Sequence, residues 1–237
     1  MRDRSLYDVL ASARRTTELA VVADVKMRSP RDGALIDTGE LDCYVDALLA
    51  GGVRALSTPT DPVHFAGGLE VAARLRARSD LPLMRKEFFR TVSQIDESVQ
   101  TGFDAVQLSV NTVPEGQLGP LRDHAERLGL EVVFGVHTLA HLEQALSFKP
   151  VAIGLNNRDI VALELDPGSV GVTEEMMKHI PPEVLVLSES SFFTVDDVGR
   201  AAAAGAEGVL VGTALAKAKD PAELLRTFRE GTRLCPR

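Results

Sequence analysis

Short runs of Val, Leu and Ile alternate along the chain with longer stretches in which apolar residues recur every three or four positions. The short runs are typical of buried β-strands, and the longer stretches are typical of amphipathic α-helices. The pattern predicts eight strands, at residues 19–26, 53–58, 81–87, 104–110, 130–136, 151–157, 184–190 and 208–213. Eight helices are predicted between and after them, at residues 39–52, 68–79, 91–102, 116–129, 139–147, 172–180, 194–205 and 221–231. Several of these helices end at glycine, as is usual for a helix C-cap.

The repeating unit is one strand followed by one helix, and it spans about thirty residues. Right-handed crossovers join such units into a parallel sheet, and eight of them close into a barrel. An open, doubly wound sheet is the competing arrangement, but its first strand is usually followed by a Gly-rich fingerprint. Here "KMRSPRDG" stands at that place. The sequence therefore predicts an α/β protein, a single (β/α)8 TIM barrel over residues 1–237.

Composition and charge argue against some binding partners and cellular compartments. The net charge is −8 and the basic residues are scattered, so no nucleic-acid surface is expected. Cys43 lies in a predicted helix and Cys235 beside the C-terminus, which favours a reducing compartment over a disulfide framework. Residues 1–22 carry charges throughout and hold no apolar run suited to a signal sequence or membrane span. We expect a cytoplasmic protein that binds neither membrane nor nucleic acid, as a monomer or weak homodimer.

Polar side chains gather where the predicted strands end, which is where barrel enzymes carry their active sites. Asp24 and Lys26 are two residues apart at the end of the first strand, so both face the barrel interior. The third, sixth and seventh strands end in the runs 85–87, 156–159 and 189–191. A solvated strand end explains any one of these runs. It explains less well the coincidence of Lys26, Lys86 and Glu189, which favours a catalytic site.

The loops after the seventh and eighth strands carry a second signal. Their small residues lead into helix N-termini, and these two loops build the usual phosphate site of such barrels. The residues predicted to hold the anion are Ser190, Ser191, Gly212 and Thr213. The alternative is that Gly212 only permits a tight turn.

A metal site is a weaker possibility. His137 and His141 are four residues apart, a spacing that suits a metal on one face of a helix. No third ligand stands near them in the sequence, so a solvated helix start is the better interpretation. We expect no metal at this position.

Five segments resemble the motifs of the indole-3-glycerol phosphate synthases of tryptophan biosynthesis. "VADVKMRSPRDG" is similar to a first-strand motif of Glu, Lys and then Ser-Pro, and "LSTPTDPVHFAGG" is similar to a Leu-Thr-Glu…Tyr-Phe-x-Gly-Ser segment. "LMRKEF", "GLNNRDI" and "LSESSF…GVLVGTAL" resemble the remaining motifs in the same order and spacing. The last motif also occurs in phosphoribosylanthranilate isomerases and tryptophan synthase α chains. The five together are specific and cover most of the chain.

This resemblance implies a lyase that closes an indole ring. Its substrate, a carboxyphenylamino-deoxyribulose 5-phosphate, loses carbon dioxide and water without a metal or organic cofactor. By the resemblance, Lys86 is the general acid on the sugar carbonyl, and Lys26 pairs with the departing carboxylate and assists dehydration. Asp24 and Glu189 stand where the family has acidic partners.

The resemblance also implies contacts with each part of the substrate. Asn156 and Arg158 would orient the substrate, and Phe65 would wall its aromatic ring. Ser29 would join the phosphate-binding loops. The binding partner expected on this basis is a small phosphorylated molecule.

Four positions depart from the family pattern. Gly135, in "EVVFGVHT", stands where the family has a catalytic Glu at the end of the fifth strand. Asp24 replaces a Glu, Gln107 replaces an apolar residue against the substrate ring, and Ser191 replaces a glycine of the phosphate loop. By the resemblance, the N-terminal extension is expected to be short and to lack much of the helix that usually covers the barrel mouth. Gly135, Asp24 and Gln107 together predict a roomier and more polar substrate pocket.

Three functions stay open on the sequence. The first is the indole-forming lyase with an altered proton relay. The second is a divergent paralogue of specialised metabolism, acting on a related phosphorylated aryl-amino ketose. The third is a silent barrel that binds a phosphorylated ligand or a partner protein, but two lysines near an interior face argue against it, because desolvation disfavours them. Gly135→Glu should raise indole formation in the first case and lower it in the second, and the pocket substitutions together favour the lower value.

Overall fold

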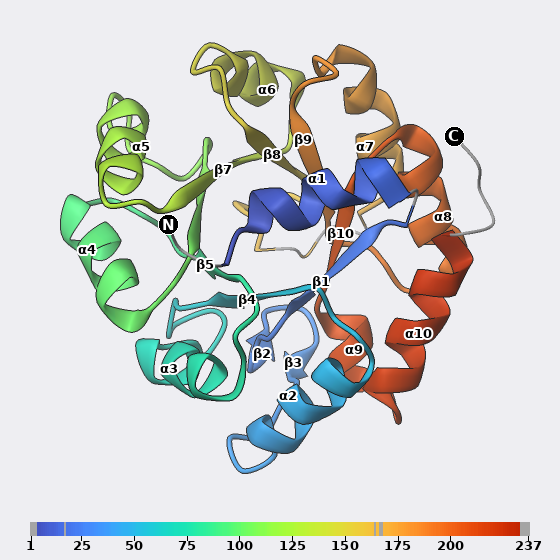
Figure 1. Ribbon diagram of the computed structural model, residues 1–237. Helices are drawn as coiled ribbons and strands as arrows, with labels where there is room; N and C mark the ends of the chain where they lie inside the picture. Colours follow the sequence, from blue (N-terminus) through green and yellow to red (C-terminus); the bar gives the residue numbers. More distant parts are fainter. Residues whose placement is uncertain (1–3, 17, 164, 166–167, 233–237) are drawn as a thin grey trace.

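Eight parallel strands close into a barrel in the computed structural model, which describes residues 4–16, 18–163, 165 and 168–232. The strands are β1 (Ala20–Asp24), β4 (Ala55–Pro59), β5 (Leu83–Lys86), β6 (Ala105–Ser109), β7 (Glu131–Val136), β8 (Ala152–Asn156), β9 (Leu185–Glu189) and β10 (Gly208–Val211). Pairing of β1 with both β4 and β10 closes the circle (Figure 1). Each strand begins and ends within two residues of its predicted range. The predicted (β/α)8 barrel is confirmed.

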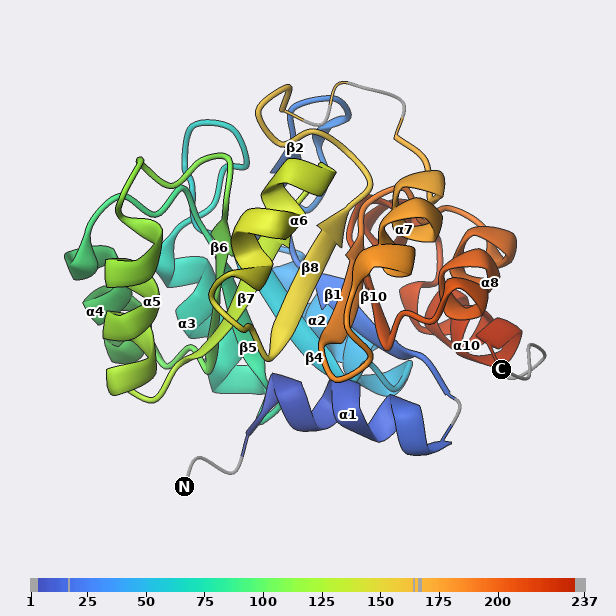
Figure 2. The same cartoon turned by 90° about the horizontal axis from the view of Figure 1, so that it is seen from above.

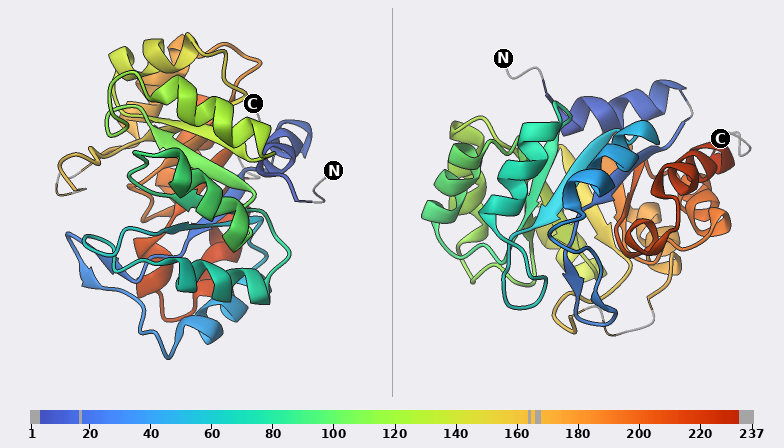
Figure 3. Two further views of the ribbon diagram at one scale, coloured as in Figure 1. Left: turned by 90° about the vertical axis from the view of Figure 1, so that its left-hand side faces the viewer. Right: turned by 90° about the horizontal axis from the view of Figure 1, so that it is seen from below.

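The predicted helices form the outer layer (Figure 3). They are α2 (Leu41–Ala50), α3 (Leu69–Arg78), α4 (Val92–Thr101), α5 (Leu118–Arg127), α6 (Leu139–Leu146), α7 (Gly171–Met176), α8 (Val195–Ala204) and α10 (Pro221–Thr232). A 3-10 turn, η1 (Met177–His179), continues α7, and a short helix, α9 (Thr213–Lys217), follows β10. Local sequence sets the ends of α8, where Thr194 and Asp197 form a capping box and Gly205 adopts the left-handed conformation.

The N-terminal end of the barrel is closed by α1 (Leu6–Thr16), a helix that the pattern of strands and helices does not predict. Leu6 and Leu10 pack into the apolar cluster inside the barrel. Glu131, at the start of β7, accepts hydrogen bonds from the backbone N–H groups of Leu6 (2.8 Å) and Tyr7 (3.0 Å), which favours a helix start there. Figure 2 shows α1 at the opposite end from the β2 loop. The described part of the extension therefore covers the base of the barrel, away from the mouth.

The barrel interior has an apolar layer and, two residues further along each strand, a polar layer. The apolar layer includes Val22, Met84, Ala105, Val133, Ala152 and Leu187. Two positions on, the same strands carry Asp24, Lys86, Gln107, Gly135, Gly154 and Glu189. Because side chains alternate between the faces of a strand with a period of two, both sets face inward. This spacing positions three of the candidate catalytic residues, Asp24, Lys86 and Glu189, at the C-terminal ends of the strands.

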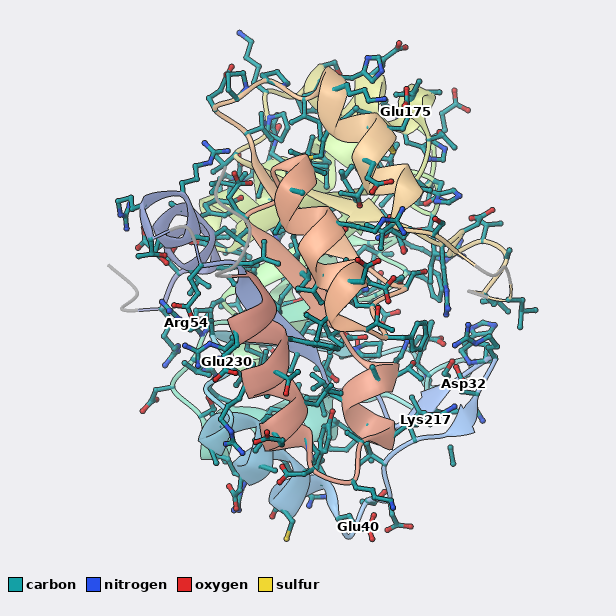
Figure 4. The ribbon with its side chains drawn as sticks, turned by 90° about the vertical axis from the view of Figure 1, so that its right-hand side faces the viewer. Asp32, Glu40, Arg54, Glu175, Lys217 and Glu230 are labelled. Atoms are coloured by element: carbon teal, nitrogen blue, oxygen red, sulfur yellow. The ribbon has the colours of Figure 1, made fainter. Side chains whose placement is uncertain are left out.

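A small hairpin follows β1 at the mouth, formed by β2 (Arg28–Ser29) and β3 (Gly33–Ala34). Its tip is tied to α9, because Lys217 Nζ lies 2.6 Å from the Asp32 carboxylate (Figure 4). The Arg31 guanidinium also lies 5.5 Å from the centre of the Phe193 ring, in the loop after β9. The hairpin is therefore held against two loops that the sequence assigns to phosphate binding.

The structure bears on the expectations about the cysteines and about membrane spans. Cys43 is an exposed free thiol on α2, and Cys235 lies outside the described residues. Within the described residues, no helix combines the length and the apolar character needed to span a membrane.

Candidate active site

An ion pair between the half-buried Lys86 and the fully buried Glu189 lies at the C-terminal ends of β5 and β9. Lys86 Nζ donates a hydrogen bond of 3.0 Å to one carboxylate oxygen of Glu189, whose side chain is 0% exposed. Burial raises the pKa of Glu189, and the nearby Lys86 charge opposes this rise. Buried ion pairs contribute little net stability, whereas a carboxyl with a raised pKa beside a cation suits proton transfer. The pair therefore favours catalysis over a structural role.

Glu189 is held from a second side by Gln107. The Gln107 Nε2 donates a hydrogen bond to the other carboxylate oxygen of Glu189. Gln107 is also buried, and the sequence predicts it against the substrate. The structure places Gln107 both on a pocket wall and in contact with Glu189. The sequence does not predict this contact, because the two residues are 82 positions apart.

The position of the expected fifth-strand carboxylate is filled rather than open. A Cβ atom built on Gly135 would lie 3.0 Å from Ser109 Oγ and 3.3 Å from Gln107 Nε2. Both distances are at or below ordinary van der Waals contact, so the neighbours already occupy the space that a side chain would need. The prediction of a roomier pocket at Gly135 is therefore wrong. Its polar character is present, supplied by Gln107 and Ser109.

Asp24 and Lys26 reach the same space from β1 and the residues after it. Both side chains are buried, and Asp24 Oδ1 has no hydrogen-bond partner among the described residues. Lys26 Nζ lies 5.8 Å from the centre of the Phe65 ring, within the range of a cation–π contact. Asp24 and Lys86 each line the two pockets described next. The four predicted catalytic residues thus lie in one region.

The first pocket, the Ser191 pocket, spans about 370 Å³ of space, open solvent included. Its polar lining consists of Asp24, Lys26, Lys86, Arg158, Ser190, Ser191, Gly212 and Thr213. Ser190 and Ser191 both have φ of 67°, the left-handed region that costs an L-residue more than glycine. Ser191 Oγ is buried there without a hydrogen-bond partner among the described residues. The four residues predicted to bind phosphate are therefore brought together, beside basic side chains.

The second pocket, the Phe65 pocket, spans about 430 Å³ of space, open solvent included. Its lining consists of Asp24, Pro59, Asp61, Phe65, Lys86, Glu87, Phe88, Gln107, Ser109 and Ile160. Phe65 is a predicted wall residue, and Phe88, Ser109 and Ile160 are additions that the sequence does not predict. Phe88 and Ile160 each had a signal, because they end the motifs "LMRKEF" and "GLNNRDI", and Ser109 lies in the predicted strand 104–110. The pocket offers an apolar wall to a flat ring.

Three predicted binding residues, Gly135, Ser29 and Asn156, lie outside both linings. Ser29 is buried in β2, with its Oγ 3.4 Å from the Asp32 carboxylate. The Asn156 side-chain oxygen accepts a hydrogen bond of 3.2 Å from the backbone N–H of Arg158. Arg158 itself lines the Ser191 pocket, where its guanidinium lies 5.6 Å from the Phe193 ring centre. Ser29 and Asn156 therefore shape the loops, and a direct contact of either with substrate stays a prediction.

The two histidines stand apart from this region. His137 Nδ1 lies 2.8 Å from the backbone oxygen of Asn156. Burial and the neighbouring His137 lower the pKa of His141, although Asp159 opposes this. In the part of the chain that the structure describes, no group of three or more His, Cys, Asp or Glu side chains is placed to hold a metal ion.

Comparison with known proteins identifies the family. The family model described as indole-3-glycerol phosphate synthase matches residues 1–228. Proteins named indole-3-glycerol phosphate synthase are 37% identical in Halalkalibacterium halodurans (92% of this chain, 84% of that one) and 34% identical in Pyrococcus abyssi (95% and 97%). A thiamine phosphate pyrophosphorylase from Pyrococcus furiosus shares the fold, with a TM-score of 0.69 and 16% identity over 93% of this chain and 98% of its own. The chain belongs to the indole-3-glycerol phosphate synthase family.

Proposed function

We propose that the protein catalyses the reaction of an indole-3-glycerol phosphate synthase, in which a carboxyphenylamino-deoxyribulose 5-phosphate closes its ring and loses carbon dioxide and water. The observation that carries the proposal is the position of Lys86, which lines both pockets and pairs with Glu189 at 3.0 Å. In this substrate the sugar carbonyl lies between the phosphate and the aryl ring. A proton donor shared by the two pockets suits that carbonyl.

The reaction needs proton transfers and charge stabilisation. The aryl carbon that bears the carboxylate attacks the carbonyl carbon, and a C–C bond forms as the Lys86 ammonium gives a proton to the carbonyl oxygen. Carbon dioxide leaves, and its bonding electrons restore the aromatic ring. The new hydroxyl takes a proton and leaves as water, and the carbon beside the nitrogen loses a proton to complete the indole. In this scheme Lys26 pairs with the carboxylate and assists dehydration, with Asp24 and Glu189 as acidic partners.

The two pockets divide the substrate between them. In the Ser191 pocket, Lys26 and Arg158 supply positive charge, and the loops after β9 and β10 match the usual phosphate site of such barrels. In the Phe65 pocket, Phe65 and Phe88 wall the aryl ring. The protein is proposed to act as a monomer or weak homodimer. The exposed Cys43 thiol supports a cytoplasmic location.

The test is incubation of the protein with the carboxyphenylamino-deoxyribulose phosphate while indole fluorescence is followed. We expect indole formation by the wild type, and a rate about 10²- to 10⁴-fold lower in Lys86→Met, which keeps most of the side-chain volume without the ammonium. Calorimetry with the same substrate separates binding from turnover. Binding to the wild type without indole formation would reject the lyase and leave a binding protein or a paralogue.

A further inference from the structure

A hydrogen bond inside the barrel joins two strands that are not neighbours. Gln107 on β6 donates to Glu189 on β9, although β7 and β8 lie between these strands. At the crossing point the intervening strands carry Gly135 and Gly154, which are paired in register. The Gln107 side chain therefore runs over two neighbouring residues that have no side chains.

Gly154 is needed for this arrangement, and Gly135 leaves room for it. A Cβ atom on Gly154 would lie 2.6 Å from Gln107 Nε2 and would also collide with the Glu189 carboxylate. A Cβ atom on Gly135 would lie 3.3 Å from the same Nε2. Neither glycine has a φ in the left-handed region, so backbone conformation does not explain their presence. The space that they leave is the reason that the amide reaches Glu189.

Each carboxylate oxygen of Glu189 has its own donor, Lys86 Nζ on one and Gln107 Nε2 on the other. Lys86 from β5 and Asp24 from β1 are the charged groups that act on this carboxylate. Its register partners on β8 and β10, Asn156 and Leu210, are uncharged. Two donors on different oxygens fix the plane of the carboxylate, which one donor leaves free to rotate.

We propose that Gln107 is a positioning residue, whose amide lies across Gly135 and Gly154 and holds Glu189 in the orientation that pairs it with Lys86. The role extends the proposed function and rests on it for the turnover readout. Gln107 acts through Glu189, so its removal should affect the chemical step more than substrate affinity. This assigns a common purpose to two positions, Gln107 and Gly135, that depart from the family pattern together.

Removal of the donor has a defined effect on ionisation. Burial raises the pKa of Glu189, and the hydrogen bonds from Lys86 and Gln107 act against it. A variant without the Gln107 donor should therefore have a higher Glu189 pKa. The limb of the pH–rate profile that reports ionised Glu189 should move to higher pH, whereas a purely structural role would lower the rate equally at all pH values.

The experiment compares Gln107→Met, which keeps the length without the donor, with Gln107→Glu, which can donate only while protonated. In Gln107→Met we expect kcat to fall about 10- to 100-fold and KM to change little. The acid limb of the pH–rate profile should move to higher pH. In Gln107→Glu, turnover should exceed that of Gln107→Met only at pH values where the new carboxyl group and Glu189 share one proton. It should fall as pH rises and that proton is lost. Gln144→Met, the same exchange on exposed α6, is the matched control and should keep the wild-type profile.

A titration without turnover separates this inference from the proposed function. The Glu189 carboxyl carbon is followed by NMR in protein with 13C-labelled Glu, assigned with Glu189→Gln. A higher Glu189 pKa in Gln107→Met supports the positioning role even if the wild type forms no indole. Wild-type turnover with an unmoved titration and profile in Gln107→Met overturns it. If Gln107→Met does not fold, a Gln107→Glu profile that matches the wild type overturns it instead.

Discussion

The apolar and polar layers inside the barrel, here the lower and the upper layer, lie on the same strands but have opposite effects on stability. The lower layer, closed by Leu6 and Leu10 of α1, is apolar and fully packed. The upper layer, two residues further along each strand, buries Glu189 and Gln107 and half-buries Lys86. Burial of apolar surface stabilises the folded state, whereas burial of charge costs free energy that the pair only partly recovers. The comparison teaches that a shift of two residues separates the part that supplies stability from the part that supplies chemistry.

The largest expected effect is in the upper layer. Lys86→Met should lower kcat by about 10²- to 10⁴-fold, because a positioned general acid is worth that much. The change also leaves Glu189 buried without its cation, so the variant should be less stable at neutral pH, and Lys86→Met/Glu189→Gln should recover stability without recovering activity. Stopped-flow fluorescence and urea denaturation measure the two effects. Near-normal kcat in Lys86→Met would remove Lys86 from the mechanism.

The lower layer should give the reverse result. Leu10→Ala removes a fully buried side chain and should lower the free energy of unfolding by about 2–5 kcal/mol. Below the new Tm, kcat and KM should stay near the wild-type values, since Leu10 lies at the other end of the barrel from the pockets. Denaturation curves and assays at 25 °C test this. A change in kcat comparable to the change in stability would show that the two layers are coupled.

The sequence predicts the order of strands and helices but only part of this contrast. Its period of two is enough to place Asp24, Lys86 and Glu189 inside, and it also separates Lys86 from Arg85, which faces outward and donates to Ser98 of α4. The sequence does not reveal the Gln107–Glu189 bond, because the contact joins residues 82 apart and depends on the shape of the closed barrel. For the same reason Gly135 was expected to be an empty space, although side chains from β6 fill it.

Gly154→Ala should lower both stability and turnover, each by less than the two variants above. Its methyl group would displace Gln107 and the Glu189 carboxylate, with an expected loss of about 1–3 kcal/mol in stability and about tenfold in kcat. Gly199→Ala is the control, because its Cβ meets open space on α8 and alanine favours a helix interior. Thermal unfolding and kinetics of the two variants decide the question. Wild-type kinetics in Gly154→Ala would mean that Glu189 tolerates other orientations.

Phosphate bound at the upper layer should stabilise the folded protein by about as much as Gly154→Ala destabilises it, or by less. At about ten times its Kd, a ligand that binds only the folded state adds about 1.4 kcal/mol. For a chain of this size that corresponds to a rise in Tm of about 3–6 °C. Arg158→Met should reduce the rise, because Arg158 lines the Ser191 pocket. Calorimetric scans with inorganic phosphate, against sodium chloride at equal ionic strength, test this, and an unchanged Tm would count against the predicted anion site.

The smallest effect is expected at the rim, where Asp32 and Lys217 tie the β2–β3 hairpin to α9. Burial raises the pKa of Asp32, but the hydrogen bonds from Lys217 and Arg31 outweigh it, so the pKa lies below its usual value. A lowered pKa in the folded state stabilises the protein above the pKa of the unfolded chain, and this contribution is lost as pH falls through the folded value. Lys217 is 52% exposed, so solvent screening limits the pair to about 1 kcal/mol or less.

Lys217→Met should therefore lower the free energy of unfolding slightly at pH 7, and its difference from the wild type should shrink as Asp32 becomes protonated. Urea denaturation of both proteins across this pH range measures the difference. A difference that is the same at every pH would show that the Lys217 side chain stabilises the rim by packing, without a contribution from its charge.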